Sequence, residues 1–338
     1  MKKIGFRIFV LVIAILLVTP LLAENGESIL DKVKNRGRLI CGVNKELPGF
    51  GYLGQDGKYK GFDVDFGRAI AAAVFGDPDK VEFRSLKGAD RFPALQTGEI
   101  DVLIRNTTWT LIRDTANGAD FAPPTFYDGQ GFMVRKDLGV TELKELDGAT
   151  IGVTSGSTTE LNLADTMRAL GIEVEAIVFE ETETLYQSYD HGRCDAVTSD
   201  KSQLISRKQA LKNPDEHIIL DITISKEPLG PVTVHGDNQW NDIVSWVVYA
   251  TFFAEEHGIT SANVKDFKTG KIEIKRFLGE TGNMGEKLGL PNDWARQVIA
   301  AVGNYGEIFE RHLTPLGLPR GVNKPWTQGG LLYAMPFR

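Results

Sequence analysis

Polar side chains capable of holding a small anion are concentrated in the sequence RFPALQTGEIDVLIRNTTWTLIRD, which spans residues 91–114. Its pattern predicts a short helix followed by a buried strand over Asp101–Ile104. Asn106 and Thr108 come directly after that strand, and Arg113 follows within reach of the same place. Open α/β sheets bind ligands at the carboxyl ends of their strands, and a guanidinium suits a carboxylate. These residues therefore predict a socket for a small anion or zwitterion.

A second cluster of the same kind begins at Thr154. The strand predicted over Ala149–Val153 is followed by the sequence TSGSTT, which places Thr158 at the expected start of a helix. Main-chain N–H groups at a helix start, together with hydroxyl groups, can bind an anion. Helix capping alone is the simpler interpretation of any one serine or threonine. Two such clusters at strand ends favour the interpretation that they bind a ligand.

Two charged residues complete the predicted site. Asp200 follows a strand predicted over Ala196–Thr198 and suits an ammonium group, although it is also placed to cap the next helix. Arg91 is expected to meet a second carboxylate on the ligand's side chain, or else to be a solvated arginine on a helix face. Asp90 is expected to cap the helix that Arg91 begins.

Composition and charge narrow the class of protein. The chain has 338 residues, of which 42% are hydrophobic and 25% charged, as in ordinary globular proteins. A net charge of -7 gives no support to nucleic-acid binding. Lys2, Lys3 and Arg7 precede an apolar run that ends near Ala23, which predicts a secretory signal peptide over residues 1–23. The alternative, a membrane anchor, is disfavoured by the short apolar run. We expect a soluble, exported protein.

Signatures of catalysis and of bound cofactors are weak. The five histidines share no metal-ligand spacing, and Ser155 and Ser157 lack the G-x-S-x-G pattern of a nucleophile. The sequence therefore predicts no catalytic residue, no metal and no cofactor. Cys41 and Cys194 are expected to be free, buried thiols in different lobes.

The order of the predicted elements favours an α/β fold. Strands and helices alternate twice along the chain, which argues for parallel sheets with right-handed crossovers. Asp63 and Asp65 fall in the first turn of a helix predicted over Gly61–Gly76, and we interpret them as structural. A long helix is predicted over Gln239–His257. One more helix and an irregular tail are expected after Pro291, the tail covering the first lobe with its apolar side chains.

Residues 61–74 resemble the signature of the family 3 bacterial extracellular solute-binding proteins, and the resemblance extends through RNTTWT, GVTSGSTTE and GRCDAVTSD. The sequences FAPPTFYDGQGFMV, SGSTTELNLAD and KNPDEHIIL are similar to the subgroup that serves general L-amino-acid ABC transporters. The resemblance implies a type II periplasmic binding protein fold, with two hinge strands and a ligand cleft between the lobes. Residues 24–133 would form lobe 1, 134–228 lobe 2, and 229–338 the return to lobe 1 with a C-terminal extension.

The same resemblance implies a role for each site residue. Arg113 would bind the α-carboxylate with help from Thr108 and Thr158, while Asp200 and the Asn106 carbonyl would bind the α-ammonium. Arg91 stands where glutamate- and aspartate-binding relatives hold the side-chain carboxylate.

Many relatives hold the ligand between aromatic rings, whereas this chain has Leu47 and Gly88 near those positions. A roomier pocket and a broad range of L-amino acids, acidic ones included, are therefore implied.

Membrane permease subunits are the partner that the resemblance implies, for a protein that is a monomer in the periplasm. The alternative function is an exported dehydratase of the cyclohexadienyl or arogenate type on the same scaffold. Such an enzyme needs an acid near the leaving group, and Glu160 is the nearest candidate in the sequence. A further role in presenting ligand to a receptor is also compatible with the sequence.

Overall fold

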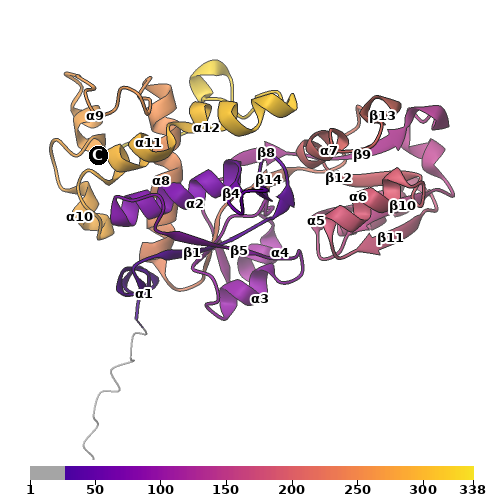
Figure 1. Cartoon of the computed structure of the whole chain (residues 1–338), viewed down its shortest axis with the longest axis horizontal. Helices are drawn as coiled ribbons and strands as arrows, with labels where there is room; N and C mark the ends of the chain where they lie inside the picture. The colour runs from indigo at the N-terminus through magenta and orange to yellow at the C-terminus, as the bar shows by residue number, and fades with distance from the viewer. Residues whose placement is uncertain (1–26) are drawn as a thin grey trace, which may run out of the picture.

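The computed structural model describes residues 27–338, which form two lobes, each built around a five-stranded sheet (Figure 1). This architecture confirms the predicted α/β fold class. The signal peptide predicted for residues 1–23 lies outside the described residues. Over the described range, none of the helices combines the length and the apolar character that crossing a membrane requires.

The sheet of the first lobe has the strand order β5-β1-β6-β15-β7. Its strands are β1 (Leu39–Val43), β5 (Val81–Ser85), β6 (Val102–Leu103), β7 (Ala119–Phe121) and β15 (Val232–Val234). β1 runs parallel to β5 and β6, as predicted, but β15 pairs antiparallel with β6 and β7. The direction of β15 is reversed because the chain enters this strand on its way back from the second lobe.

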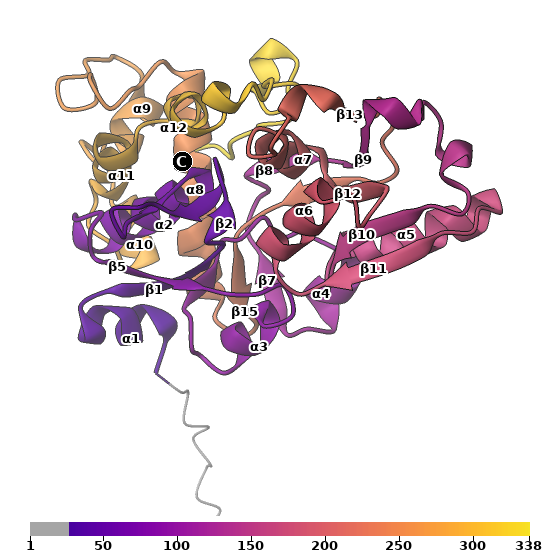
Figure 2. The same ribbon diagram turned by 45° about the vertical axis from the view of Figure 1, so that its right-hand side comes forward.

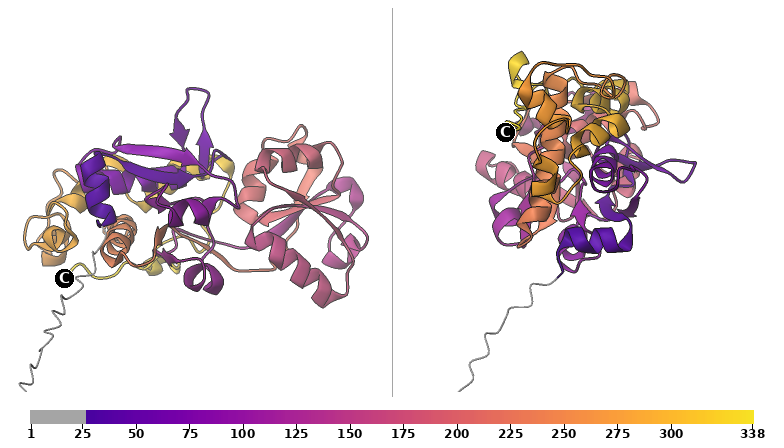
Figure 3. Two further views of the ribbon diagram at one scale, coloured as in Figure 1. Left: turned by 90° about the horizontal axis from the view of Figure 1, so that it is seen from below. Right: turned by 90° about the vertical axis from the view of Figure 1, so that its left-hand side faces the viewer.

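Helices cover both faces of this sheet. They are α1 (Ile29–Arg36), α2 (Phe62–Phe75), α3 (Arg91–Gln96), α4 (Leu111–Thr115), α8 (Asn238–Glu256), α9 (Ile272–Phe277), α10 (Met284–Leu288), α11 (Trp294–Val302) and α12 (Tyr305–His312). Almost every residue of α2 is buried, because α8, α11 and α12 pack against it. Helices α9–α11 lie at the end of the first lobe that is remote from the second lobe (Figure 3).

Three details of these helices differ from the sequence-based predictions. Helices α9 and α10 were not predicted, since they are short and lie in glycine-rich sequence. Two helices follow Pro291 instead of one, because Gly303 ends α11 and the Asn304 side chain accepts the Glu307 N–H to start α12. Asp90 does not cap α3 with its side chain, since its backbone is itself helical.

The second lobe contains the sheet of order β11-β10-β12-β9-β13. Its strands are β9 (Gln130–Arg135), β10 (Thr150–Thr154), β11 (Glu175–Phe179), β12 (Ala196–Asp200) and β13 (His217–Ile219), and its helices are α5 (Thr158–Leu170), α6 (Thr182–Asp190) and α7 (Lys201–Lys208). β10 runs parallel to β11 and β12, whereas β9 is antiparallel to β12 and β13. Cys41 on β1 and Cys194 before β12 are free and buried, which confirms the predicted state of both thiols.

The chain crosses between the lobes twice, through β8 (Phe126–Asp128) and β14 (Glu227–Leu229). These two strands pair antiparallel and lie between the lobes (Figure 1), where Figure 2 shows β8 from another side. A small separate sheet of β2 (Glu46–Leu47), β3 (Gly51–Leu53) and β4 (Tyr59–Lys60) reaches from the first lobe toward α6 and α7. Single 3₁₀ turns lie at Lys136–Leu138, Leu143–Leu146, Pro214–Glu216, Thr314–Leu316 and Trp326–Gln328.

The C-terminal segment packs on the first lobe, as expected, but with only part of its apolar surface. Leu332 and Phe337 are buried, and the Phe337 ring contacts several aromatic rings of the core. Trp326, Leu331 and Tyr333 remain about half exposed.

One residue of the C-terminal segment attaches it to the hinge. The buried Asn323 side chain accepts the Tyr127 N–H at 2.7 Å and donates to the Tyr127 carbonyl at 2.9 Å. The segment is therefore hydrogen-bonded to hinge strand β8.

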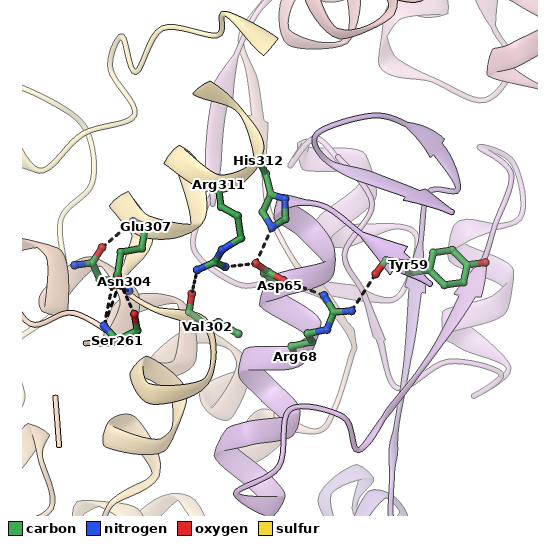
Figure 4. Close-up of polar contacts among 9 residues, drawn as sticks. All are labelled: Tyr59, Asp65, Arg68, Ser261, Val302, Asn304, Glu307, Arg311 and His312. Carbon is green, nitrogen blue, oxygen red and sulfur yellow. Dashed lines mark hydrogen bonds and ion pairs between the residues drawn. The ribbon is translucent and has the colours of Figure 1, made fainter. Parts of the chain in front are cut away.

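Asp65 joins the start of α2 to the end of α12 (Figure 4). Its buried carboxylate accepts hydrogen bonds from Arg68 at 3.0 Å, from Arg311 at 2.5 Å and contacts the His312 ring at 2.7 Å. Burial alone would raise the pKa of Asp65, but the His312 hydrogen bond and the charges of Arg311 and Arg68 lower it below its usual value. Asp65 therefore has the structural role expected of it, since it holds the start of α2 against the end of α12.

We expect Asp65→Asn to lower the free energy of unfolding at pH 7 by about 2 kcal/mol, because it removes the anion shared by these cations. Since the folded pKa is lowered, the stabilisation is present above about pH 4 and is lost as the pH falls through the folded pKa. Urea denaturation at pH 7 and at pH 3 measures both effects. Asp79→Asn, an exposed change in the same lobe, is the control; equal stabilities of the two variants at pH 7 would contradict the prediction.

Candidate ligand-binding site

A cavity of about 40 Å³ lies between the lobes, where the polypeptide leaves β6 in the first lobe and β10 and β12 in the second. The seven site residues predicted from the sequence all line it: Arg91, Asn106, Thr108, Arg113, Thr154, Thr158 and Asp200. Its other lining residues are Asn44, Gly88, Arg105, Ser155, Ser157, Thr159, Thr182, Ser199 and Gln203. The wall is thus formed almost wholly by polar side chains from both lobes.

Arg113 supplies a buried cation from the first lobe. It lies on α4, and the hydroxyl of Thr110, directly before this helix, accepts the Arg113 N–H and so caps the start of the helix. One terminal nitrogen of its guanidinium donates to the Thr108 carbonyl at 3.0 Å. The Nε and Nη2 groups have no acceptor among residues 27–338 and remain available to a ligand carboxylate. Burial lowers the pKa of Arg113, as expected for a desolvated cation.

Asp200 supplies a buried anion from the second lobe. It is the last residue of β12 and is only 6% exposed. Although it precedes α7, its side chain makes no capping hydrogen bond, and no donor within residues 27–338 reaches its carboxylate. Burial and the nearby carboxylates of Asp128 and Glu227 raise its pKa. An acceptor-only group left without a donor in such a place suits an ammonium ion.

Asn106 is held in a strained conformation beside the cavity. Its φ of 34° is the only positive value among non-glycine residues of the described range. The Asp63 carboxylate, at the start of α2, accepts the Asn106 N–H at 2.8 Å and so fixes this turn. The side-chain oxygen of Asn106 is buried and has no hydrogen-bond partner in the part of the chain described. Asp63 therefore positions a residue of the site and does more than favour the helix dipole.

Thr158 links the cavity to the hinge. Its hydroxyl donates to Glu227 of β14 at 2.9 Å and lies 3.4 Å from the Thr108 hydroxyl across the cleft. Because a hydroxyl has one proton, Thr158 can offer a ligand only an acceptor at this oxygen. Its N–H, at the start of α5, remains the group suited to a carboxylate.

The Glu227 side chain also accepts from Asn162, at 2.9 Å, and from Ser225. The hinge strand thus holds the beginning of α5 in place.

Arg91 connects the two lobes. Each of its three guanidinium nitrogens has a protein acceptor: the Gly88 carbonyl at 2.9 Å, the Thr107 hydroxyl at 3.4 Å and the Gly156 carbonyl of the second lobe at 3.1 Å. Arg91 is 3% exposed, so it is not a solvated arginine. Its contact with a ligand carboxylate stays a prediction, since these bonds occupy much of its donor capacity.

No aromatic ring lines the cavity within the described residues. Leu47 is fully buried in the first lobe, and Phe50 belongs to the same core. Gly88 faces the second lobe so closely that a Cβ there would lie 2.7 Å from the Ser155 carbonyl oxygen. A larger side chain at position 88 would therefore collide with the opposite lobe in this closed arrangement.

Two functional candidates were missed from the sequence. Arg105 lines the cavity directly before Asn106, and its place at the end of a strand was a usable signal. Glu227 precedes Pro228 in a three-residue strand that has no periodicity. Its partners Thr158 and Asn162 are 69 and 65 residues away in the sequence, so no local pattern indicates them.

The chain is similar to proteins of known classes. The model of the family 3 bacterial extracellular solute-binding proteins matches residues 39–165. Over 315 residues the chain is 55% identical to the general L-amino acid-binding periplasmic protein AapJ of Rhizobium johnstonii, covering 91% of this chain and 92% of AapJ. It is 52% identical to the glutamate/glutamine/aspartate/asparagine-binding protein BztA of Rhodobacter capsulatus, covering 92% of this chain and 94% of BztA.

A solved structure is similar over nearly the whole chain. It is an ABC transporter periplasmic binding protein from Brucella ovis with glutathione bound. The two superpose with a TM-score of 0.90 at 49% identity, covering 93% of this chain and all of that one.

The position of Asp63 generates a prediction about pH. Burial raises the pKa of Asp63 to about 7. The folded state therefore retains a proton that the unfolded chain loses near pH 4, and the resulting stabilisation disappears as the pH rises toward 7. Asp63→Asn keeps an acceptor for the Asn106 N–H without this titration. Relative to the natural protein, we expect the variant to gain about 2 kcal/mol of unfolding free energy between pH 5 and pH 8.

Urea denaturation at the two pH values measures the gain. The Asp79→Asn control should show none, because Asp79 is exposed. A stability difference between Asp63→Asn and the natural protein that does not change with pH would show that Asp63 ionises normally.

Proposed function

The chain belongs to the family 3 bacterial extracellular solute-binding proteins, and on this basis we propose that it captures L-amino acids in the periplasm and delivers them to the permease subunits of an ABC transporter. The proposed ligands include acidic and neutral amino acids, as the names of AapJ and BztA suggest for those relatives. We propose further that the protein is exported by its signal peptide and acts as a monomer.

The observation that carries this proposal is the pair of opposed, incompletely bonded charges in the cavity. Arg113 of the first lobe and Asp200 of the second match the carboxylate and ammonium groups that every free α-amino acid presents. Glutathione, bound by the Brucella ovis relative, has the same pair of groups at its glutamyl end. Charge-assisted hydrogen bonds contribute roughly 1.5–3 kcal/mol each, so about four of them support micromolar or tighter binding after the cost of closure.

The lobes are proposed to close on the ligand by bending at β8 and β14, with residues 134–228 moving against 24–133 and 229–338. Contacts between the lobes around the cavity support this motion. Lys87 pairs with Glu180 and Glu181 at 3.1 and 3.0 Å, and Arg207 donates to the Glu46 carbonyl at 3.0 Å. These bonds are made between lobes and must break when the cleft opens.

We propose binding without turnover. The acid expected of a dehydratase, Glu160, uses its carboxylate to accept the Gly156 N–H at 3.0 Å. It is also absent from the lining of the cavity. An assay for release of phenylpyruvate from prephenate tests this alternative, and measurable turnover by the pure protein would favour it.

The proposal is tested by calorimetric titration of the mature protein against the common L-amino acids, after unfolding and refolding to remove bound ligand. We expect micromolar or tighter dissociation constants for acidic and for neutral amino acids. Binding confined to glutamate and aspartate would restrict the proposed range and give a cationic side chain the selecting role. No binding by correctly refolded protein would contradict the proposal.

We expect Arg113→Ala and Asp200→Ala each to raise the dissociation constants of all ligands by at least about 100-fold. Each variant removes the buried charge that we assign to one end of the zwitterion, and loss of two charge-assisted bonds amounts to about 3 kcal/mol or more. Arg168→Ala, which changes an exposed arginine of the second lobe, is the control. Calorimetry measures these dissociation constants, and near-normal affinity in either site variant would contradict this assignment of the site.

A further inference from the structure

Arg105 borders two cavities at once. It lines the ligand cavity, and it also lines a neighbouring space of about 200 Å³ whose walls come from both lobes. Asn44 and Thr182 likewise line both spaces, so the two adjoin at these three side chains. We call the second space the side chamber. The two spaces therefore lie on either side of these three side chains, and of the three only Arg105 carries a charge.

The Arg105 guanidinium has N–H groups that donate no hydrogen bond within residues 27–338. Arg105 is 7% exposed, and its Nε donates to the Leu86 carbonyl at 2.8 Å. Its two terminal nitrogens have no hydrogen-bond acceptor, and no carboxylate lies within 4 Å of them, among residues 27–338. Burial lowers the pKa of Arg105 to about 10, so the group stays charged at neutral pH. A buried guanidinium with unused donors at a cavity wall calls for an anionic partner.

The three carboxylates whose charges act on Arg105, those of Glu46, Asp63 and Glu181, bond to other groups. Asp63 accepts the Asn106 N–H, and Glu46 accepts the Glu183 N–H at 3.1 Å. Glu181 pairs with Lys87 at 3.0 Å, and both residues line the side chamber. Arg91 differs from Arg105 in this respect, because all three of its nitrogens already have protein acceptors. Among the arginines of the cavity, Arg105 is therefore better placed than Arg91 to take a second ligand carboxylate.

We propose that Arg105 and the side chamber form a second subsite for a carboxylate at the far end of the ligand's side chain, so that the protein binds γ-glutamyl peptides as well as free amino acids. The inference rests on the proposed function, because Arg113 and Asp200 must hold the head group. A γ-glutamyl peptide keeps its α-ammonium and α-carboxylate free, and its extended side chain ends in another carboxylate. An α-linked peptide has no carboxylate beside its ammonium and does not fit the head-group site.

The test compares L-glutamine with γ-L-glutamylglycine, which is glutamine carrying a carboxymethyl group on its side-chain nitrogen. Calorimetric titration of the refolded mature protein should show binding of both, and at least about 100-fold weaker binding of α-L-glutamylglycine. Arg105→Met should weaken γ-glutamylglycine by about 30-fold, the value of one charge-assisted contact, and glutamine by less than about threefold. Arg105→Lys keeps the charge without the planar fork and should give an intermediate loss for the peptide.

The possible results distinguish failure of the second subsite from failure of the proposed amino-acid binding. The second subsite is wrong if glutamine binds but γ-glutamylglycine does not. It is also wrong if Arg105→Met and Arg105→Lys bind the peptide as the natural protein does. In either case the proposed amino-acid site is unaffected. If neither compound binds and the amino-acid panel is also silent, both proposals fail. Arg168→Met is the control for the loss of an arginine. If Arg105→Met does not fold, the affinity of Arg105→Lys for the peptide tests the second subsite.

Discussion

Arg113 of the first lobe and Asp200 of the second carry opposite charges into the same buried space. Arg113 is 8% exposed and Asp200 is 6% exposed, and within residues 27–338 each lacks protein partners for much of its hydrogen-bonding capacity. Burying an incompletely paired charge is unfavourable, and a zwitterion that bridges the two relieves both costs together. In the proposed function, such a ligand would bind the closed arrangement better than an open one, and this difference in affinity would drive closure.

Much of the remaining architecture keeps these charges in position. Helix α2 is buried on nearly every side, and its first turn supplies Asp63, which fixes the strained turn at Asn106. Glu227 on hinge strand β14 holds the start of α5 through Thr158 and Asn162. The site is thus positioned by a rigid helix on one side and by the hinge itself on the other. Because Glu227 of the hinge is hydrogen-bonded to the helix that lines the cavity, bending at the hinge is linked to occupation of the cavity.

The sequence predicted the elements best where local signals agreed. The helices predicted over Gly61–Gly76 and Gln239–His257 agree with α2 and α8 to within one residue at each end, because an apolar pattern and end signals coincide there. The polar clusters after β6, β10 and β12 were found since strand ends meet at one edge of a sheet. The contacts of Glu227 with Thr158 and Asn162 were not predictable, because they join residues more than 60 positions apart. Residue type also did not reveal that main-chain carbonyls would occupy Arg91 and leave Arg105 with unused donors.

Closure and discrimination between ligands rest on different groups. The bonds of Lys87, Arg91 and Arg207 across the cleft join protein to protein, two of these residues donating to main-chain carbonyls. Their energy is the same whichever ligand is enclosed. Arg113 and Asp200 would contact only the α-carboxylate and the α-ammonium, which are the same in every L-amino acid. Discrimination must therefore come from the wall around the side chain, and a polar wall without aromatic rings imposes little shape on it. In the function proposed here, closure that does not depend on the ligand's side chain would allow one cleft to bind many amino acids.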